Sequence, residues 1–77
     1  MRIAVELFGL PAGHGPGSRG AFPLEIDAGA TASRLIERLG LPPELPLMVL
    51  INGQRVDTGH PLNDGDEVFI FSPVAGG

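Results

Sequence analysis

The sequence predicts an α+β fold, in which one helix packs across one face of a mixed sheet of four to five strands. Three observations predict this architecture. Residues 2–8 and 21–27 alternate between apolar and polar side chains with the period of two that is typical of half-buried strands. Residues 32–39 place apolar side chains at helical spacing. Residues 67–71 are apolar on both faces, which favours a strand at the centre of the sheet.

The first two strands are predicted to form a hairpin with a long connection. The first strand turns Ile3, Val5 and Leu7 to one face. Pro23 lacks the backbone N–H that a central strand needs, so the second strand is expected at an edge of the sheet. Residues 9–20 are rich in glycine, but they lack the Gly-Lys-Ser/Thr ending of a phosphate-binding segment and are interpreted as a loop.

Residue types at both ends of the helical segment indicate where the helix begins and ends. Thr31 is expected to be the N-cap, because its hydroxyl can accept a hydrogen bond from a free N–H of the first turn. Gly40 is expected to follow the helix in a left-handed conformation, which glycine adopts without steric cost. The helix is therefore predicted over residues 32–39, between these two signals.

The second half of the chain predicts a hairpin and a final strand. Residues 48–51 are a short apolar strand, and the Asn52-Gly53 pair that follows is a strong two-residue hairpin signal. Residues 54–57 form the polar return strand, and residues 63–66 form a tight turn by residue type. If the first and last strands pair in parallel at the centre of the sheet, the fold is a β-grasp.

The β-grasp arrangement predicts which side chains face the helix. Val49, Ile51, Val68 and Ile70 are expected to face it, so Leu50, Phe69 and Phe71 are expected on the open face of the sheet. Apolar side chains exposed together predict a docking patch for a protein partner. The alternative is that loops cover them, or that a register shift of one residue exchanges the two faces.

The composition limits the possible functions. A chain of 77 residues makes one small domain, predicted here as residues 1–72 followed by a flexible tail, residues 73–77. The lack of cysteine excludes disulfides, thiolate metal sites and a cysteine nucleophile. The net charge of −4 argues against nucleic-acid binding and favours a basic protein partner. The lack of cysteine also fits the cytoplasmic location that we expect. We expect no membrane association, because no apolar run is long enough to span a bilayer.

Isolated polar side chains do not predict a further site. His14 and His60 are far apart in the sequence and are interpreted as surface residues, with no metal bound. Asp64, Asp66 and Glu67 lack the spacing of a calcium loop and are interpreted as part of a turn.

The sequence ends in a Gly-Gly pair directly after the last apolar strand. Gly76 can adopt backbone angles closed to other residues, and Pro73 favours an extended start to the tail. Such a tail can thread a narrow channel and carry the Gly77 carboxylate to a distant active site. The alternative is a frayed terminus that happens to be rich in glycine, because the chain holds twelve glycines.

Two motifs resemble the ubiquitin-like sulfur carriers (MoaD/ThiS), which comprise the small subunit of molybdopterin synthase and the sulfur carrier of thiamine biosynthesis. The first motif is Gly65-Asp66-Glu67-Val68, before the final apolar strand, and the second is Pro73-Val74-Ala75-Gly76-Gly77. The complete ending, Phe-Ser-Pro-Val-Ala-Gly-Gly, is most similar to the molybdopterin synthase small subunit.

The resemblance implies a mechanism. A ubiquitin-activating-like adenylyltransferase uses ATP and magnesium to adenylate the Gly77 carboxylate, and a sulfur-donor persulfide protein then displaces AMP to leave a thiocarboxylate. In molybdopterin synthase the tail inserts into the large subunit and donates this sulfur to a pterin precursor. The resemblance thus implies a non-catalytic subunit that binds no cofactor itself. It assigns the reacting carbon to Gly77 and the partner contacts of the tail to Pro73, Val74, Ala75 and Gly76.

Three other functions remain open from the sequence. The chain could carry sulfur for thiamine synthesis or another thiolation pathway. It could also be a ubiquitin-like modifier that forms isopeptide bonds to lysines through Gly77. Finally, it could be a plain interaction domain, in which case deletion of Gly77 would leave its function intact.

Overall fold

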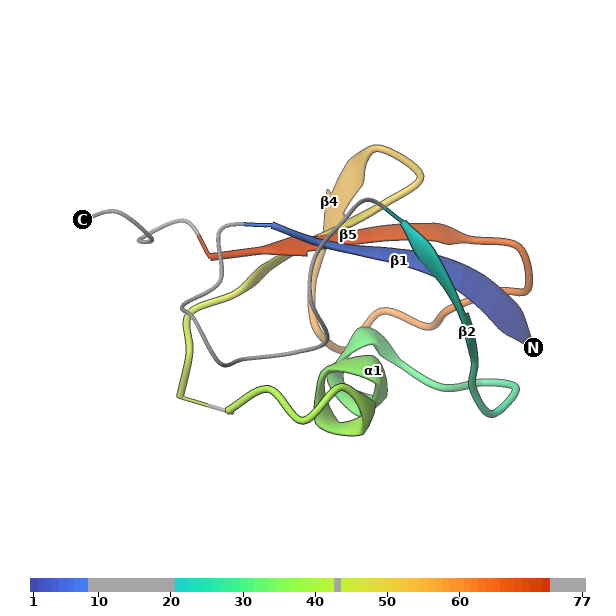
Figure 1. Cartoon of the computed structure of the whole chain (residues 1–77), viewed down its shortest axis with the longest axis horizontal. Helices are drawn as coiled ribbons and strands as arrows, with labels where there is room; N and C mark the ends of the chain where they lie inside the picture. The colour runs from blue at the N-terminus through green and yellow to red at the C-terminus, as the bar shows by residue number, and fades with distance from the viewer. Residues whose placement is uncertain (9–20, 43, 73–77) are drawn as a thin grey trace.

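The structure, a computed structural model, describes residues 1–8, 21–42 and 44–72 (Figure 1). This part of the chain forms one five-stranded sheet and one helix. In chain order, the elements are β1 (Arg2–Phe8), β2 (Phe22–Glu25), α1 (Ala32–Arg38), β3 (Met48–Ile51), β4 (Gln54–Val56) and β5 (Glu67–Phe71). Among the described residues, no helix is long and apolar enough to cross a membrane.

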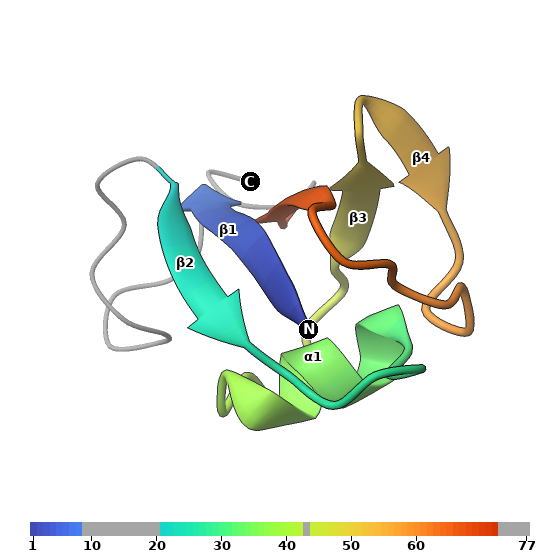
Figure 2. The ribbon, with the colours of Figure 1, turned by 90° about the vertical axis from the view of Figure 1, so that its right-hand side faces the viewer.

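The strand order is β2-β1-β5-β3-β4, which places the last strand at the centre. β1 pairs with β5 in parallel, whereas the β1–β2, β3–β4 and β3–β5 pairs are antiparallel. Helix α1 crosses one face of the sheet, and no described element covers the other face, which we call the open face (Figures 1 and 2). The predicted mixed sheet and the β-grasp topology are confirmed. The strand that carries Pro23 is an edge strand, also as predicted.

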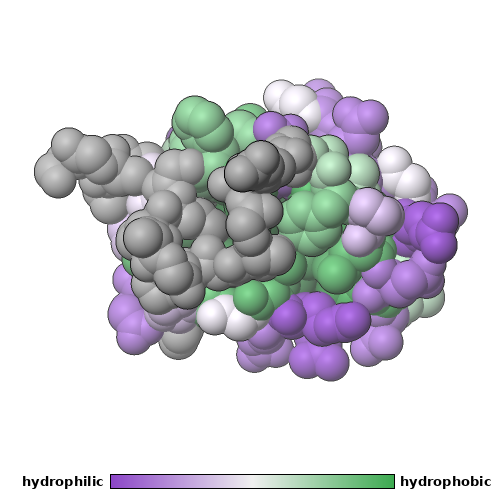
Figure 3. All heavy atoms as spheres, viewed as in Figure 1, coloured by the Kyte–Doolittle hydropathy of each residue, from purple (hydrophilic) through white to green (hydrophobic). Residues whose placement is uncertain are grey.

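The hydrophobic core lies between the sheet and α1. Side chains from the central strands and from the helix are completely or almost completely buried, including Val5 from β1, Leu35 from α1 and Ile70 from β5. Leu62, which comes from the loop before β5, is also buried in this cluster. Figure 3 shows hydrophilic residues over the part of the surface where α1 lies and hydrophobic residues across the middle of the same view.

Both predicted capping residues, Thr31 and Gly40, are confirmed. The hydroxyl of Thr31 accepts a hydrogen bond from the backbone N–H of Arg34 at 3.3 Å. At the other end Gly40 has φ +76°, and the N–H groups of Gly40 and Leu41 return to carbonyls of the last turn at 3.0 and 3.2 Å. The helix itself ends at Arg38, one residue before the predicted end, because Leu39 is the C-cap residue of this closure.

The predicted turns of the second half are also confirmed. Asn52 and Gly53 join β3 to β4 with φ values of +51° and +85°, which is the combination that a type I′ turn requires. The turn before β5 closes with a hydrogen bond from the Asp66 N–H to the Asn63 carbonyl at 3.1 Å. Within it, Gly65 has φ +86°.

Candidate functional site

The pairing register fixes which side chains of the central strands face the helix. Val49 pairs with Ile70 and Ile51 pairs with Val68, and all four side chains are buried in the core that includes α1. The residue between them on β3, Leu50, pairs with Phe69. Because successive side chains on a strand point to opposite faces, this register places Leu50 and Phe69 on the open face. The predicted division between the two faces is confirmed.

Four apolar side chains gather on the open face, and we call them the aromatic patch: Phe8, Leu50, Phe69 and Phe71. The ring centroid of Phe69 lies 6.0 Å from that of Phe8 and 5.6 Å from that of Phe71, distances typical of aromatic contacts. Leu50, Phe69 and Phe71 are half-buried, whereas Phe8 remains 63% exposed. The open face therefore presents a continuous apolar strip across β1, β5 and β3.

Phe8 is the member of the aromatic patch that the sequence analysis missed. Phe8 is separated from Ala4 and Glu6 by an even number of positions on β1, so its side chain points to the same face as theirs. Its register partner on β5 is Phe71. The alternation of residues 2–8 already contained this signal. This alternation extends to Phe8, the last residue before the glycine-rich segment.

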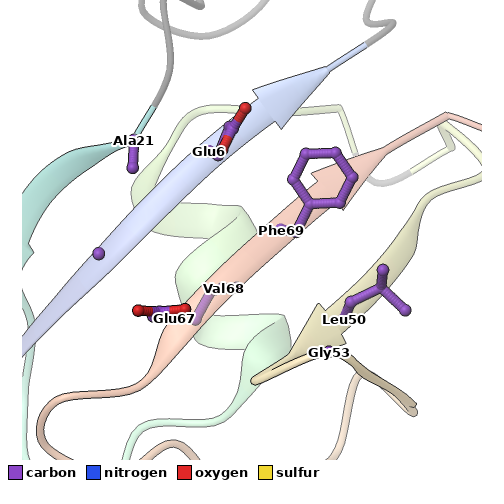
Figure 4. Close-up of a pocket in the computed structure, with 8 residues that line it drawn as sticks. Glu6, Ala21, Leu50, Gly53, Glu67, Val68 and Phe69 are labelled. Carbon is purple, nitrogen blue, oxygen red and sulfur yellow. The ribbon is translucent and has the colours of Figure 1, made fainter.

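Beside the aromatic patch the open face is hollowed. The hollow has a volume of about 400 Å³, and small residues of three segments, Ala4, Ala21 and Gly53, form part of its lining. The carboxylates of Glu6 and Glu67 also line it, together with Phe69. Figure 4 shows that Glu6, Phe69 and Leu50 project from the side of the sheet that faces away from α1.

A hydrogen-bonded cluster fixes the beginning of β5. The side-chain amide of Asn52 donates to Asp66 Oδ1 at 3.0 Å, and its oxygen accepts from the backbone N–H of Glu67 at 2.9 Å. The second oxygen of Asp66 accepts from the backbone N–H of Asn63 at 2.8 Å. Asp66 is only 7% exposed, so these hydrogen bonds compensate the loss of water around its carboxylate. The sequence predicted a turn here, but not the link to Asn52.

The other end of β5 leads toward the predicted reactive tail. Phe71 pairs with Phe8 of β1 on one side and with Met48 of β3 on the other, and the next residue, Ser72, is 7% exposed. The chain is therefore held by neighbouring strands up to the point where the tail begins. The predicted tail residues lie outside the described residues: Pro73, Val74, Ala75, Gly76 and Gly77.

Residues 18–77 match the model of the ThiS family, and this match includes both the Gly65–Val68 motif and the whole tail. The chain belongs to the ThiS family. The resemblance to the ubiquitin-like sulfur carriers is thereby confirmed. No curated protein matches this ThiS-family chain.

Solved structures resemble this ThiS-family chain over all or nearly all of its length. The crystal structure of SAMP1 from Haloferax volcanii matches with a TM-score of 0.72 and 26% identity, covering 100% of both chains. The crystal structure of H. volcanii small archaeal modifier protein 1 matches with a TM-score of 0.67 and 25% identity, covering 95% of this chain and 98% of that one.

A third structure supports the fold alone. It is the protein–protein complex of subunit 1 and 2 of molybdopterin-converting factor from Helicobacter pylori 26695. The matching chain is 24% identical, with a TM-score of 0.61 and 100% coverage of both chains. The β-grasp topology of this ThiS-family chain is thus shared with a chain of a two-component assembly and with an archaeal modifier.

Proposed function

We propose that this ThiS-family chain is a sulfur carrier whose Gly77 carboxylate is adenylated and converted to a thiocarboxylate, which donates sulfur in molybdopterin biosynthesis. The observation that carries the proposal is the family match over residues 18–77, which extends through the Gly-Gly pair. The position of β5 supports it, because the central strand leads directly into the tail.

The proposed reaction activates a carboxylate that is otherwise a poor electrophile. A Gly77 carboxylate oxygen attacks the α-phosphorus of ATP, and pyrophosphate leaves. The terminal sulfur of a persulfide then attacks the Gly77 carbonyl carbon, and AMP leaves with its bonding electron pair. A thiol attacks the donor-side sulfur of the resulting acyl disulfide, forming a disulfide with the donor and releasing the thiocarboxylate. The carrier contributes a positioned terminus to these steps.

The aromatic patch is the proposed docking surface for the protein partners. These partners are a ubiquitin-activating-like adenylyltransferase, which uses ATP and magnesium, a sulfur-donor persulfide protein and the large subunit of molybdopterin synthase. The two-component complex from H. pylori supports a large-subunit partner by analogy of fold. Because the adenylyltransferase and the large subunit would use the same patch, they would bind in succession.

A second function is favoured by the archaeal structures. One of them is described as a small archaeal modifier protein, and its identity to this chain is 25%. The same adenylated Gly77 could form isopeptide bonds to lysines of other proteins. Sulfur transfer for thiamine or another thiolation pathway is the remaining alternative, because it uses the same terminus.

The deciding experiment is the intact mass of the protein purified from its native cell without reducing or alkaline treatment. We expect a species that is heavier by the mass difference between sulfur and oxygen, and this species should disappear when Gly77 is deleted. The same spectrum establishes whether the chain ends at Gly77 in the cell. Co-purification of a larger pterin-binding subunit would support the molybdopterin pathway.

Two results would contradict the proposal. High-molecular-weight adducts that end in this tail, without any thiocarboxylate, would favour the modifier function. Only the carboxylate form, even after incubation with a cognate adenylyltransferase, a persulfide donor and ATP, would exclude the sulfur-carrier function.

A further inference from the structure

The hollow on the open face combines two carboxylates with an aromatic ring. On the paired strands β1 and β5, Ala4 is in register with Glu67 and Glu6 with Phe69, so the two glutamates are diagonal neighbours. Their side chains share the face that Figure 4 shows, on either side of the hollow. The small side chain of Ala4 leaves room between them.

Within the described part of the chain, neither glutamate has a cationic or hydrogen-bonding partner for its carboxylate. Arg2 lies on the same strand as Glu6 and on the same face, but its side chain is paired with that of Glu25 at 2.9 Å. Arg55 of β4 is in register with Leu50 of β3, and β3 therefore lies between Arg55 and β5. Among the described residues, the hollow is thus a site of negative charge without a paired cation, beside the aromatic patch.

We propose that the hollow is a socket for an arginine side chain of the protein partner that docks on the open face. This inference rests on the proposed function, because it names the chemistry by which that partner is recognised. A carboxylate on each side can accept hydrogen bonds from the five N–H donors of one guanidinium group. The apolar stem of the arginine would lie against Phe69 and Leu50. The stem of a lysine could make the same contacts.

Arginine fits the socket better than lysine for two reasons. Its guanidinium group is planar and forked, so it can bond two carboxylates that diverge from neighbouring strands. It is also less strongly hydrated than an ammonium group and stacks on aromatic rings, and Phe69 lies in the same hollow. The charge would give the partner a defined register on an otherwise apolar surface.

The first test uses the free protein and two small probes. One is the capped peptide acetyl-Gly-Arg-Gly-amide, and the other carries citrulline, which has the same shape without the charge. Titration followed by amide chemical shifts should show saturable changes centred on Glu6, Glu67 and Phe69 for the arginine peptide alone. The E6Q/E67Q variant should weaken this binding about fivefold, as expected for two exposed ion pairs.

A matched control separates the socket from the overall charge of the protein. The E44Q/D57N variant removes the same number of charges from exposed positions outside the hollow, so it should bind the arginine peptide as the wild type does. Equal shifts with the citrulline peptide, or equal weakening by E44Q/D57N, would overturn the proposal.

The second test uses the cognate adenylyltransferase in an ATP–pyrophosphate exchange assay. E6Q/E67Q should raise the KM for the carrier about tenfold and leave kcat unchanged, with the difference shrinking at high salt. An unchanged KM alongside normal thiocarboxylate formation would overturn the socket and leave the proposed function intact. Failure of the wild-type protein to form thiocarboxylate would instead overturn the proposed function, while the peptide titration would still decide the socket.

Discussion

Asn52 donates a hydrogen bond from its side-chain amide to the carboxylate of Asp66 at 3.0 Å, across fourteen positions of sequence. This contact joins the β3–β4 turn to the residue that precedes the central strand. The backbone N–H of Asn52 also donates to the Glu67 carbonyl, at 2.8 Å. The start of β5 is therefore fixed by side-chain and backbone bonds together, and with it the register of the strand that carries the tail.

The amide and the carboxylate of this pair can be exchanged without losing a hydrogen bond. In the N52D/D66N variant, the carboxylate now at position 52 would accept from the Glu67 N–H. The amide now at position 66 would donate to that carboxylate and accept from the Asn63 N–H. Each single variant instead places two acceptors or two amides against each other.

We expect each single variant to lower the free energy of unfolding by about 2 kcal/mol and the double variant to recover most of this loss. Urea unfolding of the wild type and the three variants measures these differences. If the loss of unfolding free energy in the double variant equals the sum of the two single losses, the proposed exchange of hydrogen bonds is wrong.

Ile70 tests the helix-facing side of the central strand. Its side chain is completely buried, so Ile70→Ala removes apolar contacts and leaves a cavity beneath α1. We expect the free energy of unfolding to fall by about 2–5 kcal/mol. The measurement is chemical denaturation, and Ile70→Val, which deletes a single methylene group, should cost about 0.5–1.5 kcal/mol. A loss for Ile70→Ala no larger than that for Ile70→Val would contradict this packing.

Phe69, the preceding residue on the same strand, tests the open face. Phe69→Ala should weaken binding to the adenylyltransferase by about 2 kcal/mol or more, as expected for an aromatic side chain at the centre of a docking surface. Because Phe69 is half-buried outside the core, the variant should keep the native circular dichroism spectrum. Calorimetric titration measures the affinity. Binding equal to that of the wild type would show that the partner uses another surface.

Gly53 tests the conformation of the β3–β4 turn. Its φ of +85° is unfavourable for any residue with a Cβ, although no atom lies within 4 Å of where that Cβ would be placed. Gly53→Ala should therefore destabilise the protein by about 1–2 kcal/mol through backbone conformation alone. Gly59→Ala is the control, because Gly59 has equally open surroundings and no positive φ. Thermal unfolding should show a lower midpoint for Gly53→Ala only.

Much of the fold could be predicted from local sequence signals. Thr31, Gly40 and the Asn52-Gly53 pair each act on the backbone within a few residues, so their effects do not depend on the rest of the chain. The central place of β5 was also predictable, because apolar residues on both faces of a strand indicate burial from both sides. The division of its side chains between the two faces followed from the alternation of Val68 to Phe71.

The features that were missed depend on residues brought together by pairing. The contact between Asn52 and Asp66 joins two turns. In the sequence alone, the preference of each turn for Asn or Asp is enough to explain why each residue is there. The alternation of residues 2–8 indicated the face on which Phe8 lies, but its contact with the aromatic side chains of β5 required its register against Phe71. The hollow required small residues of three separate segments to meet. None of these juxtapositions has a local pattern in the sequence.

The parallel pairing of β1 and β5 has a mechanical consequence. A partner that draws the tail into a channel pulls on the chain beyond Ser72, and this force acts along β5. The hydrogen bonds to β1 and β3 cross the direction of the pull, so they are loaded together in shear instead of being opened one after another. If the proposed partner draws in the tail, the domain is thus expected to withstand the tension and to limit how far the tail enters.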